Sequence, residues 1–256
     1  MPNYTLTHNP SVAPDQAHSS ASAPTSSLEA CTPAETQLSL LSVSLQILDQ
    51  PLTLLRSGQV GDKEMTKPSS LIPGSSLGRH LRQLSLVPRS MHDHFRLLLD
   101  ALPSSSTRSS TQPLLLNYDV RLRSPLEESA STAIAELESA QQRLREAFAM
   151  EEQRGEERSA ASSSSSSSSA AAAAAAEPLV QRKIILKATT PMSVEFESTV
   201  GRELWFVCLH AIHHLALMRP ILSQELGLKL DAEFGVAPST LVNRAWNTGR
   251  AIASKL

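Results

Sequence analysis

The sequence predicts an all-α fold, a four-helix bundle with a short β-hairpin before the last long helix. Three observations lead to this prediction. Two segments begin with a capping box whose first helical position is proline, a pattern typical of a helix N-terminus. Long stretches repeat apolar residues at spacings of three and four, which is the period of an α-helix. One short stretch rich in β-branched residues and divided by a turn indicates two strands.

The first helix is predicted to begin at Thr32, because Thr32-Pro33-Ala34-Glu35 forms a capping box. Pro51 should kink this helix, since proline lacks the backbone donor that a helix interior needs. Leucines at helical spacing form its apolar stripe: Leu38, Leu41, Leu45, Leu48, Leu52 and Leu55.

The second helix is predicted over 76–102, with Pro88 in its middle. The third is predicted to begin with the capping box Ser124-Pro125-Leu126-Glu127. It continues through apolar residues that keep one face: Ile134, Leu137, Leu144 and Phe148.

The hairpin and the fourth helix follow. Leu179–Ala188 and Val194–Glu197 are the predicted strands, separated by the turn Thr189–Ser193. The fourth helix is predicted over 200–226, with Gly227 as its stop signal.

Two segments have the composition of unfolded chain. Residues 1–31 are rich in Ser, Pro and Ala and are predicted to be a disordered tail, because they cannot bury enough apolar surface to offset their ordering entropy. Residues 32–256 are predicted to be one bundle domain, interrupted at 151–178 by a low-complexity insertion with eight serines followed by seven alanines.

Composition excludes several classes of protein. The chain has 23 Lys and Arg against 25 Asp and Glu, which argues against a nucleic-acid partner. No uninterrupted apolar run approaches the roughly 18 to 20 residues that span a bilayer, so no membrane partner is expected. Cys31 and Cys208 are too few for a disulfide framework or a Cys-based zinc site, which predicts a cytoplasmic protein.

Histidines are the residues that point to chemistry, since six of the eight fall in the second and fourth predicted helices. His210 and His214 lie four residues apart, so both can point at one metal ion from one helix face. A third imidazole from a facing helix would leave one coordination position for water, as in catalytic zinc sites. His213 lies off that face. The alternative is that this spacing arose by chance and that the histidines lie on the surface or satisfy hydrogen bonds in the core.

Several phrases of the sequence resemble the DinB-like (DinB/YfiT-like) metalloenzyme superfamily. They occur in the expected order over about residues 34–240: Ser-Ser-Leu-Gly-Arg-His (75–80), His-Asp-His-Phe-Arg-Leu-Leu-Leu (92–99), Asn-Tyr-Asp-Val-Arg-Leu-Arg (117–123), Ser-Thr-Val-Gly-Arg-Glu-Leu (198–204), His-Ala-Ile-His-His (210–214) and Phe-Gly-Val-Ala-Pro-Ser-Thr (234–240). The resemblance implies a four-helix bundle that holds a divalent metal through one histidine of the second helix and a later HxxxH pair. Carried over by position, the ligands are His94, His210 and His214.

The chain departs from that pattern between Gln83 and Met91, where about seven extra residues separate the family-like phrases of the second helix. Proline costs about 3 kcal/mol in a helix interior. Either the helix breaks at Pro88, or the stretch is a gene-model artefact such as a misplaced splice boundary. This departure affects which of His80, His92 and His94 faces the metal.

Other residues are candidates to support a ligand imidazole or to line the cavity. His80, His92 and His213 are three of them. The cluster Tyr118, Asp119, Arg121 and Arg123 can bind a polar or anionic substrate group, or Asp119 and an arginine can simply fix the loop. Glu203 lies two turns before His210 and can accept a hydrogen bond from a ligand imidazole, or it can serve the helix dipole.

The sequence therefore predicts a metal-dependent enzyme, a hydrolase or thiol S-transferase acting on a small molecule, with a three-histidine site. The alternative is a non-enzymatic helical bundle that binds a metal or a small ligand. The expected cofactor is a divalent metal ion, with zinc or nickel as the first candidates; imidazole ligands suit several metals, so the sequence does not choose between zinc, nickel, iron and manganese. The expected partner is a small-molecule substrate, with thiols among the candidates, and the prediction allows a homodimer.

Overall fold

The structure is a computed structural model that describes residues 32–82, 91–102, 113–120, 125–163, 178–189 and 191–240. The side chains of 91–94 and 154–163 lie outside that description, although their backbone is helical. The predicted tail, residues 164–177 of the predicted insertion, Arg121 and Arg123 also lie outside it. All the described residues belong to one compact unit, Thr32–Leu256.

The first helix, α1 (Pro33–Arg56), confirms its predicted start. The Thr32 hydroxyl accepts a hydrogen bond from the backbone N–H of Glu35 at 3.2 Å, and the Glu35 carboxylate accepts one from the backbone N–H of Thr32 at 2.8 Å. Pro51 lies inside the helix. A short helix, α2 (Asp62–Thr66), follows, which the sequence does not predict because five residues carry no periodic signal.

The second predicted helix consists of two helical pieces in the described residues. These are α3 (Leu77–Arg82) and α4 (Met91–Ala101), and residues 83–90 with Pro88 lie outside the description.

The third predicted helix begins later than its capping box indicates. Pro125–Glu127 is a separate 3-10 turn, η1, and the long helix α5 runs over Ala130–Ser163. Residues 151–163 of the predicted insertion continue α5. Near the other end of the chain, α7 (Val200–Pro220) leads into the π-helical turn η3 (Ile221–Glu225). Gly227 follows with a φ of 68°, a conformation that glycine adopts without strain.

The predicted fold class, an all-α four-helix bundle with a hairpin, is wrong, because the described chain contains a three-stranded mixed sheet. The hairpin itself is present as β2 (Lys183–Thr189) and β3 (Ser193–Thr199), preceded by the 3-10 turn η2 (Leu179–Gln181). The third strand, β1 (Leu114–Asn117), pairs in parallel with β2, so that Leu114 lies opposite Ile184. The sequence prediction fails here because this pairing joins segments far apart in the chain.

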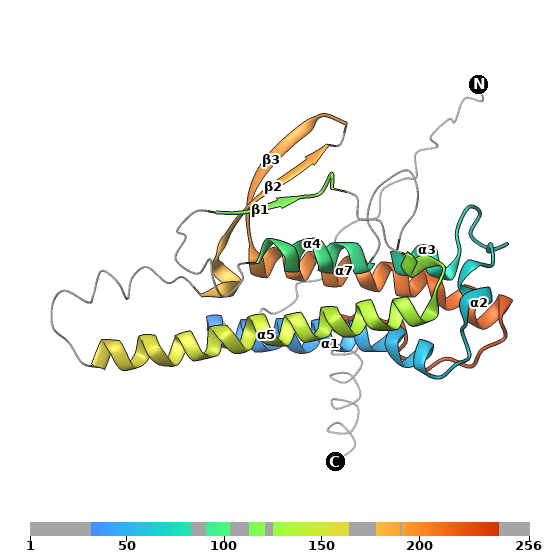
Figure 1. The fold of residues 1–256 in the computed structure, drawn as a ribbon, viewed down its shortest axis with the longest axis horizontal. Helices are drawn as coiled ribbons and strands as arrows, with labels where there is room; N and C mark the ends of the chain where they lie inside the picture. Colours follow the sequence, from blue (N-terminus) through green and yellow to red (C-terminus); the bar gives the residue numbers. More distant parts are fainter. Residues whose placement is uncertain are drawn as a thin grey trace, which may run out of the picture. The chain divides into compact units, whose positions relative to one another are not determined.

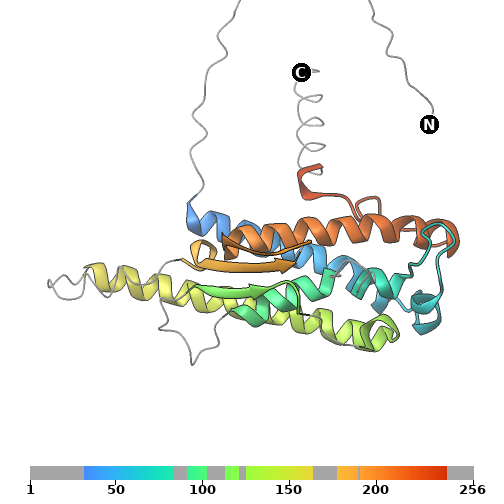
Figure 2. The same cartoon turned by 90° about the horizontal axis from the view of Figure 1, so that it is seen from above.

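Helices α1, α4, α5 and α7 enclose the core. Helix α1 packs against α5 and α7, and α4 packs against the same two helices. Leu48, Leu98, Leu137 and Leu204 come from these four helices in turn, and each is at most 1% exposed. The sheet lies over α4 and α7, where β1 contacts α4 and β3 contacts α7 (Figures 1 and 2). The N-terminal half of α7 therefore lies between the sheet and the helical core.

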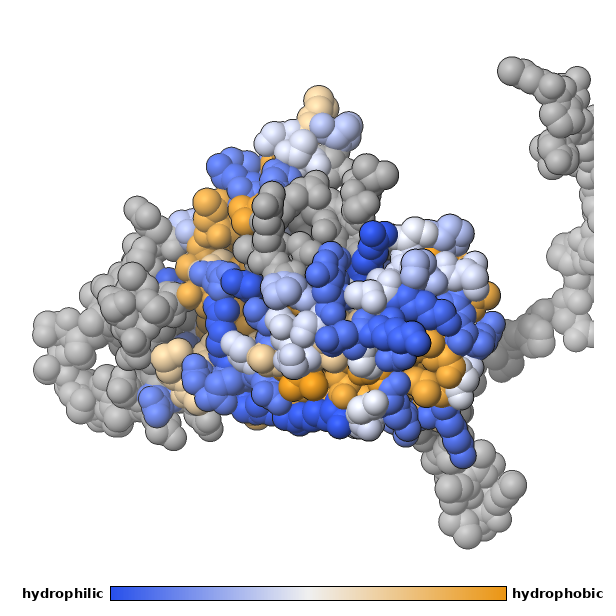
Figure 3. Space-filling model, turned by 45° about the vertical axis from the view of Figure 1, so that its right-hand side comes forward, coloured by the Kyte–Doolittle hydropathy of each residue, from blue (hydrophilic) through white to orange (hydrophobic). Residues whose placement is uncertain are grey.

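The surface mixes polar and apolar residues, as one face in Figure 3 shows. The large apolar side chains that are exposed come from several elements: Leu38, Leu71, Leu115, Val120, Met192, Phe196, Trp205 and Leu209. Two helical segments, Ala34–Arg56 and Val200–Glu225, are long and apolar enough to cross a membrane by length and composition. Core helices of soluble proteins pass the same test, and both segments contribute buried residues to this core.

Candidate functional site

Two histidines predicted as metal ligands lie together on α7. The Nε2 atoms of His210 and His214 are 2.9 Å apart. Their rings meet edge to face, with centroids 4.6 Å apart. His214 is buried and His210 is partly buried, so the pair lies at the edge of the core rather than on the open surface.

A third histidine approaches from another helix. His80 of α3 is fully buried, and its Nδ1 lies 3.2 Å from Nδ1 of His214. The other ring nitrogen of His80, Nε2, lies 2.6 Å from the hydroxyl of buried Ser75. Burial, with a smaller contribution from the nearby His213, lowers the pKa of His80 to about 4. His80 is therefore a neutral imidazole at pH 7.

The other candidate histidines are His213, His92 and His94. His213 is exposed, and its ring centroid lies 5.4 Å from that of His214. His92 and His94 belong to α4, which packs against α7, but their side chains lie outside the described residues. The choice of His94 as a ligand therefore stays a prediction.

The residues fit part of a metal site. Two nitrogens that bind one ion at about 2.0 to 2.1 Å lie about 3 Å apart, which matches the separation of the two Nε2 atoms on α7. His214 faces His210 with Nε2 and His80 with Nδ1, so His80 lies behind His214 and not at the same point. Among the side chains that the structure describes, no group of three or more His, Cys, Asp or Glu could hold a metal ion. The sequence predicts His94 as the third ligand, and its side chain lies outside the described residues.

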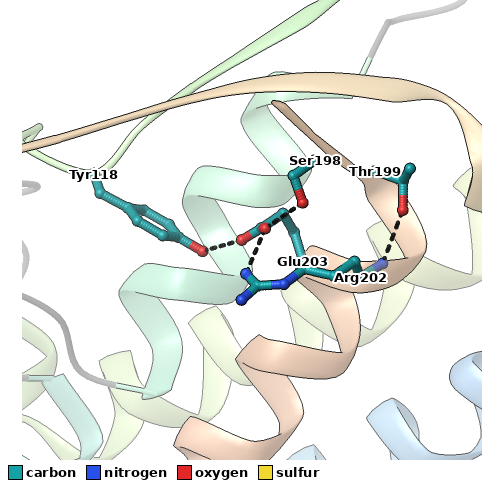
Figure 4. Close-up of polar contacts among 5 residues, drawn as sticks. All are labelled: Tyr118, Ser198, Thr199, Arg202 and Glu203. Carbon is teal, nitrogen blue, oxygen red and sulfur yellow. Dashed lines mark hydrogen bonds and ion pairs between the residues drawn. The ribbon is translucent and has the colours of Figure 1, made fainter. Parts of the chain in front are cut away.

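A buried carboxylate lies two turns before His210 on α7. Glu203 is fully buried and accepts hydrogen bonds from the Tyr118 hydroxyl at 2.7 Å, the Ser198 hydroxyl at 2.6 Å and the Arg202 guanidinium at 2.7 Å (Figure 4). Thr199 caps the same helix end, since its hydroxyl accepts from the backbone N–H of Arg202. The described contacts of Glu203 thus join the sheet to the start of α7.

An aromatic side chain links this network to the histidines. The guanidinium of Arg202 lies 5.3 Å from the centroid of the Phe206 ring, and Phe206 stacks on His210 with centroids 6.2 Å apart. Tyr118 also contacts Phe206, at 6.3 Å between centroids. Two of the predicted cavity residues, Tyr118 and Glu203, therefore belong to one connected cluster beside His210.

Asp119 fixes the sheet. Its two carboxylate oxygens accept hydrogen bonds from the backbone N–H of Thr189 at 3.0 Å and from the Thr189 hydroxyl at 2.9 Å. This contact joins the turn after β1 to the end of β2. These contacts fit a loop-fixing role for Asp119, while Arg121 and Arg123, with which the prediction pairs it, lie outside the described residues.

The sequence alone does not identify Ser75 or the carboxylate that anchors its loop. Oε1 of Glu225, in η3, accepts hydrogen bonds from the backbone N–H groups of Ser70 at 2.7 Å and Leu71 at 2.8 Å, and from the hydroxyls of Ser69 and Ser70. The bond from Leu71 is the largest cause that lowers the pKa of Glu225. The loop then closes on Ser75, whose carbonyl accepts from Ser69 at 2.9 Å. No local sequence pattern links residues so far apart.

We expect the variant Glu225→Ala to release this loop. Removing the carboxylate takes the acceptor from the amides of Ser70 and Leu71, so their hydrogen exchange should accelerate by about tenfold or more. Amide exchange followed by NMR measures this. The control is Glu233→Ala, which removes an exposed carboxylate, and equal exchange in both variants would contradict the anchoring role.

Comparisons with known proteins show no family for this chain. No family model matches it, and no solved structure matches it. The chain is similar to the FK506-binding protein 5 of Rhizopus delemar, with 45% identity over 62 residues. That stretch covers 23% of this chain and 16% of the Rhizopus protein, far less than two thirds of either. The similarity to the DinB-like superfamily therefore stays a resemblance.

Proposed function

We propose that the protein is a metal-dependent enzyme, a hydrolase or thiol S-transferase, that acts on a small molecule. In this proposal a divalent ion, zinc or nickel, binds to Nε2 of His210, Nε2 of His214 and an imidazole of α4, that of His94. The resemblance to DinB-like metalloenzymes supports the same ligands.

One observation carries the proposal, the 2.9 Å approach of the two Nε2 atoms on one face of α7. Two imidazole nitrogens at this separation suit a borderline divalent ion, and the partly buried setting limits competition from water. Helix α4, which carries His94, packs against α7, the helix that carries the pair.

The chain's own residues would prepare the site as follows. Three protein ligands would leave one coordination position of a divalent ion open, and the ion would lower the pKa of a water or hold a thiolate in that position. His80 holds the ring of His214 from behind. Phe206 packs against His210 on the side of the Arg202–Glu203 pair, which restricts the orientation of His210.

Metal titration tests the site. We expect metal-free protein to bind one zinc or nickel ion in calorimetry, and His210→Ala or His214→Ala to weaken binding by about 100-fold or more, since each removes one of few ligands. His213→Ala is the matched control, because it removes an exposed imidazole of the same helix and should change affinity less than about twofold.

Absence of binding by the wild-type protein, or equal losses in all three variants, would contradict the metal site. A protein that binds the ion but turns over no substrate in a panel of thiol transfers and hydrolyses would favour the non-enzymatic alternative.

A further inference from the structure

The buried histidines form a continuous hydrogen-bonded series that ends at a serine. The Ser75 hydroxyl meets Nε2 of His80, Nδ1 of His80 meets Nδ1 of His214, and Nε2 of His214 meets Nε2 of His210. Ser75, His80 and His214 are 2%, 0% and 4% exposed, so water does not compete for these bonds. Each ring therefore presents a defined nitrogen to its neighbour.

A neutral imidazole carries one N–H, so the series has two consistent hydrogen-bond directions. In the first, Ser75 donates to His80, His80 donates from Nδ1 to His214, and His214 donates from Nε2 to His210. In the second, His214 donates from Nδ1 to His80, and His80 donates from Nε2 to the Ser75 hydroxyl, so that Nε2 of His214 carries no hydrogen. A metal ion bound to both Nε2 atoms would take the place of the hydrogen bond between His214 and His210.

The two directions differ in what His214 offers to a metal. A metal ion binds to the lone pair of Nε2. In the first direction Nε2 of His214 carries the hydrogen and has no free lone pair, and in the second it carries no hydrogen and can bind the ion. The second direction requires that Nδ1 of His80 accept from His214 and that Ser75 accept from His80. His80 can accept at Nδ1, because Nε2 of the same ring faces the Ser75 oxygen and can carry the ring's hydrogen.

We propose that His80 is a positioning residue for the metal site: it holds His214 in the tautomer protonated at Nδ1, so that Nε2 of His214 faces the ion. Ser75 completes this role by accepting from Nε2 of His80. The inference rests on the proposed function, and it assigns to α3 and its preceding loop a part in metal binding that the ligand spacing on α7 does not reveal.

Three variants test the role of His80. His80→Phe keeps a ring of similar shape and removes both ring nitrogens. His80→Asn keeps an amide oxygen close to the position of Nδ1, which can still accept from His214. The variant Ser75→Ala removes the far end of the series. Circular dichroism establishes that each variant folds before any binding measurement.

Zinc affinity and imidazole tautomers are the two readouts. We expect His80→Phe to weaken zinc binding by about 10-fold to 100-fold, His80→Asn to stay within about threefold of wild type, and Ser75→Ala to lie between them. Nitrogen-15 NMR of the zinc-loaded wild type should show His214 protonated at Nδ1. In metal-free His80→Phe, the same signal should show a mixture of tautomers.

The outcomes separate this inference from the proposed function. If the wild type binds zinc and His80→Phe binds it within twofold, His80 has no positioning role and the metal site stands. If His214 carries its hydrogen on Nε2 in the loaded protein, that nitrogen is not a ligand, and both the proposed ligand set and the role of His80 fail. If the wild type binds neither zinc nor nickel, the proposed function fails and this inference fails with it.

Discussion

Replacing Gly78 by alanine should destabilise the protein by about 3 kcal/mol or more, because the added carbon overlaps the backbone of η1. A Cβ atom on Gly78 would overlap the carbonyl oxygen of Glu127 and lie 2.7 Å from its carbonyl carbon. Both are backbone atoms and cannot rotate away. Helix α3 would have to separate from η1, although alanine is the better helix former by about 1 kcal/mol.

Urea denaturation measures this loss, and Gly58→Ala is its control. Gly58 has a φ of 72°, and a Cβ atom added there would meet no atom within 4 Å, so its replacement costs only the conformational strain of about 1 to 2 kcal/mol. A Gly78→Ala variant as stable as Gly58→Ala would show that α3 and η1 are not packed as described. Since His80 lies two residues after Gly78, a folded Gly78→Ala variant should also bind zinc more weakly.

Replacing Glu203 by alanine should cost about 3 kcal/mol, because hydrogen bonds to a charged group contribute about 1.5 to 3 kcal/mol each and the change also leaves a cavity. The fully buried carboxylate accepts from Tyr118, Ser198 and Arg202. The ion pair with Arg202 adds little by itself, since the Arg202 side chain is 61% exposed and water can replace its partner.

Two further variants show how much the hydrogen bonds of Glu203 contribute to this loss of stability. Tyr118→Phe removes one of the three bonds and should cost about 1 to 2 kcal/mol. Glu197→Gln, at an exposed carboxylate on β3, should stay within about 0.5 kcal/mol of wild type. Thermal and urea unfolding measure all three variants. A loss below about 1 kcal/mol for Glu203→Ala would contradict a network that joins the sheet to α7.

The sequence predicts the start of α1, the hairpin and the end of α7, because each depends on residues close together in the chain. The capping box at Thr32 marks the start of α1, and the β-branched stretch around Ile184 marks the hairpin, because both depend on residues close in the chain. The end of α7 is also predicted to within a few residues, since Gly227 adopts a left-handed conformation after η3.

Non-local packing decides the elements that the sequence does not reveal. Strand β1 has only four residues, and its partner β2 lies far along the chain, so neither alternation nor a turn marks it. The capping-box pattern at 124–127 fits a helix start, but its proline and leucine belong to η1, where Leu126 is fully buried. Burial of that leucine overrides the local preference.

The sequence likewise predicts one contact of the candidate site and misses another. The four-residue spacing of His210 and His214 fixes their common face, so the sequence alone brings them together. The contact between His80 and His214 depends on how α3 packs, which the spacing of residues within one helix does not encode. Packing explains why glycine occurs at position 201, in one of the phrases that resemble the DinB-like superfamily: a Cβ atom there would lie 2.8 Å from the carbonyl oxygen of Val180.

A crystal structure of zinc-loaded protein, with data collected at the zinc absorption edge, tests the metal site most directly. The account predicts one anomalous peak at about 2.0 to 2.1 Å from Nε2 of His210 and from Nε2 of His214, with an α4 imidazole as a further ligand and His80 bonded to Nδ1 of His214. A peak bound elsewhere, or loaded protein without a peak between His210 and His214, would contradict it.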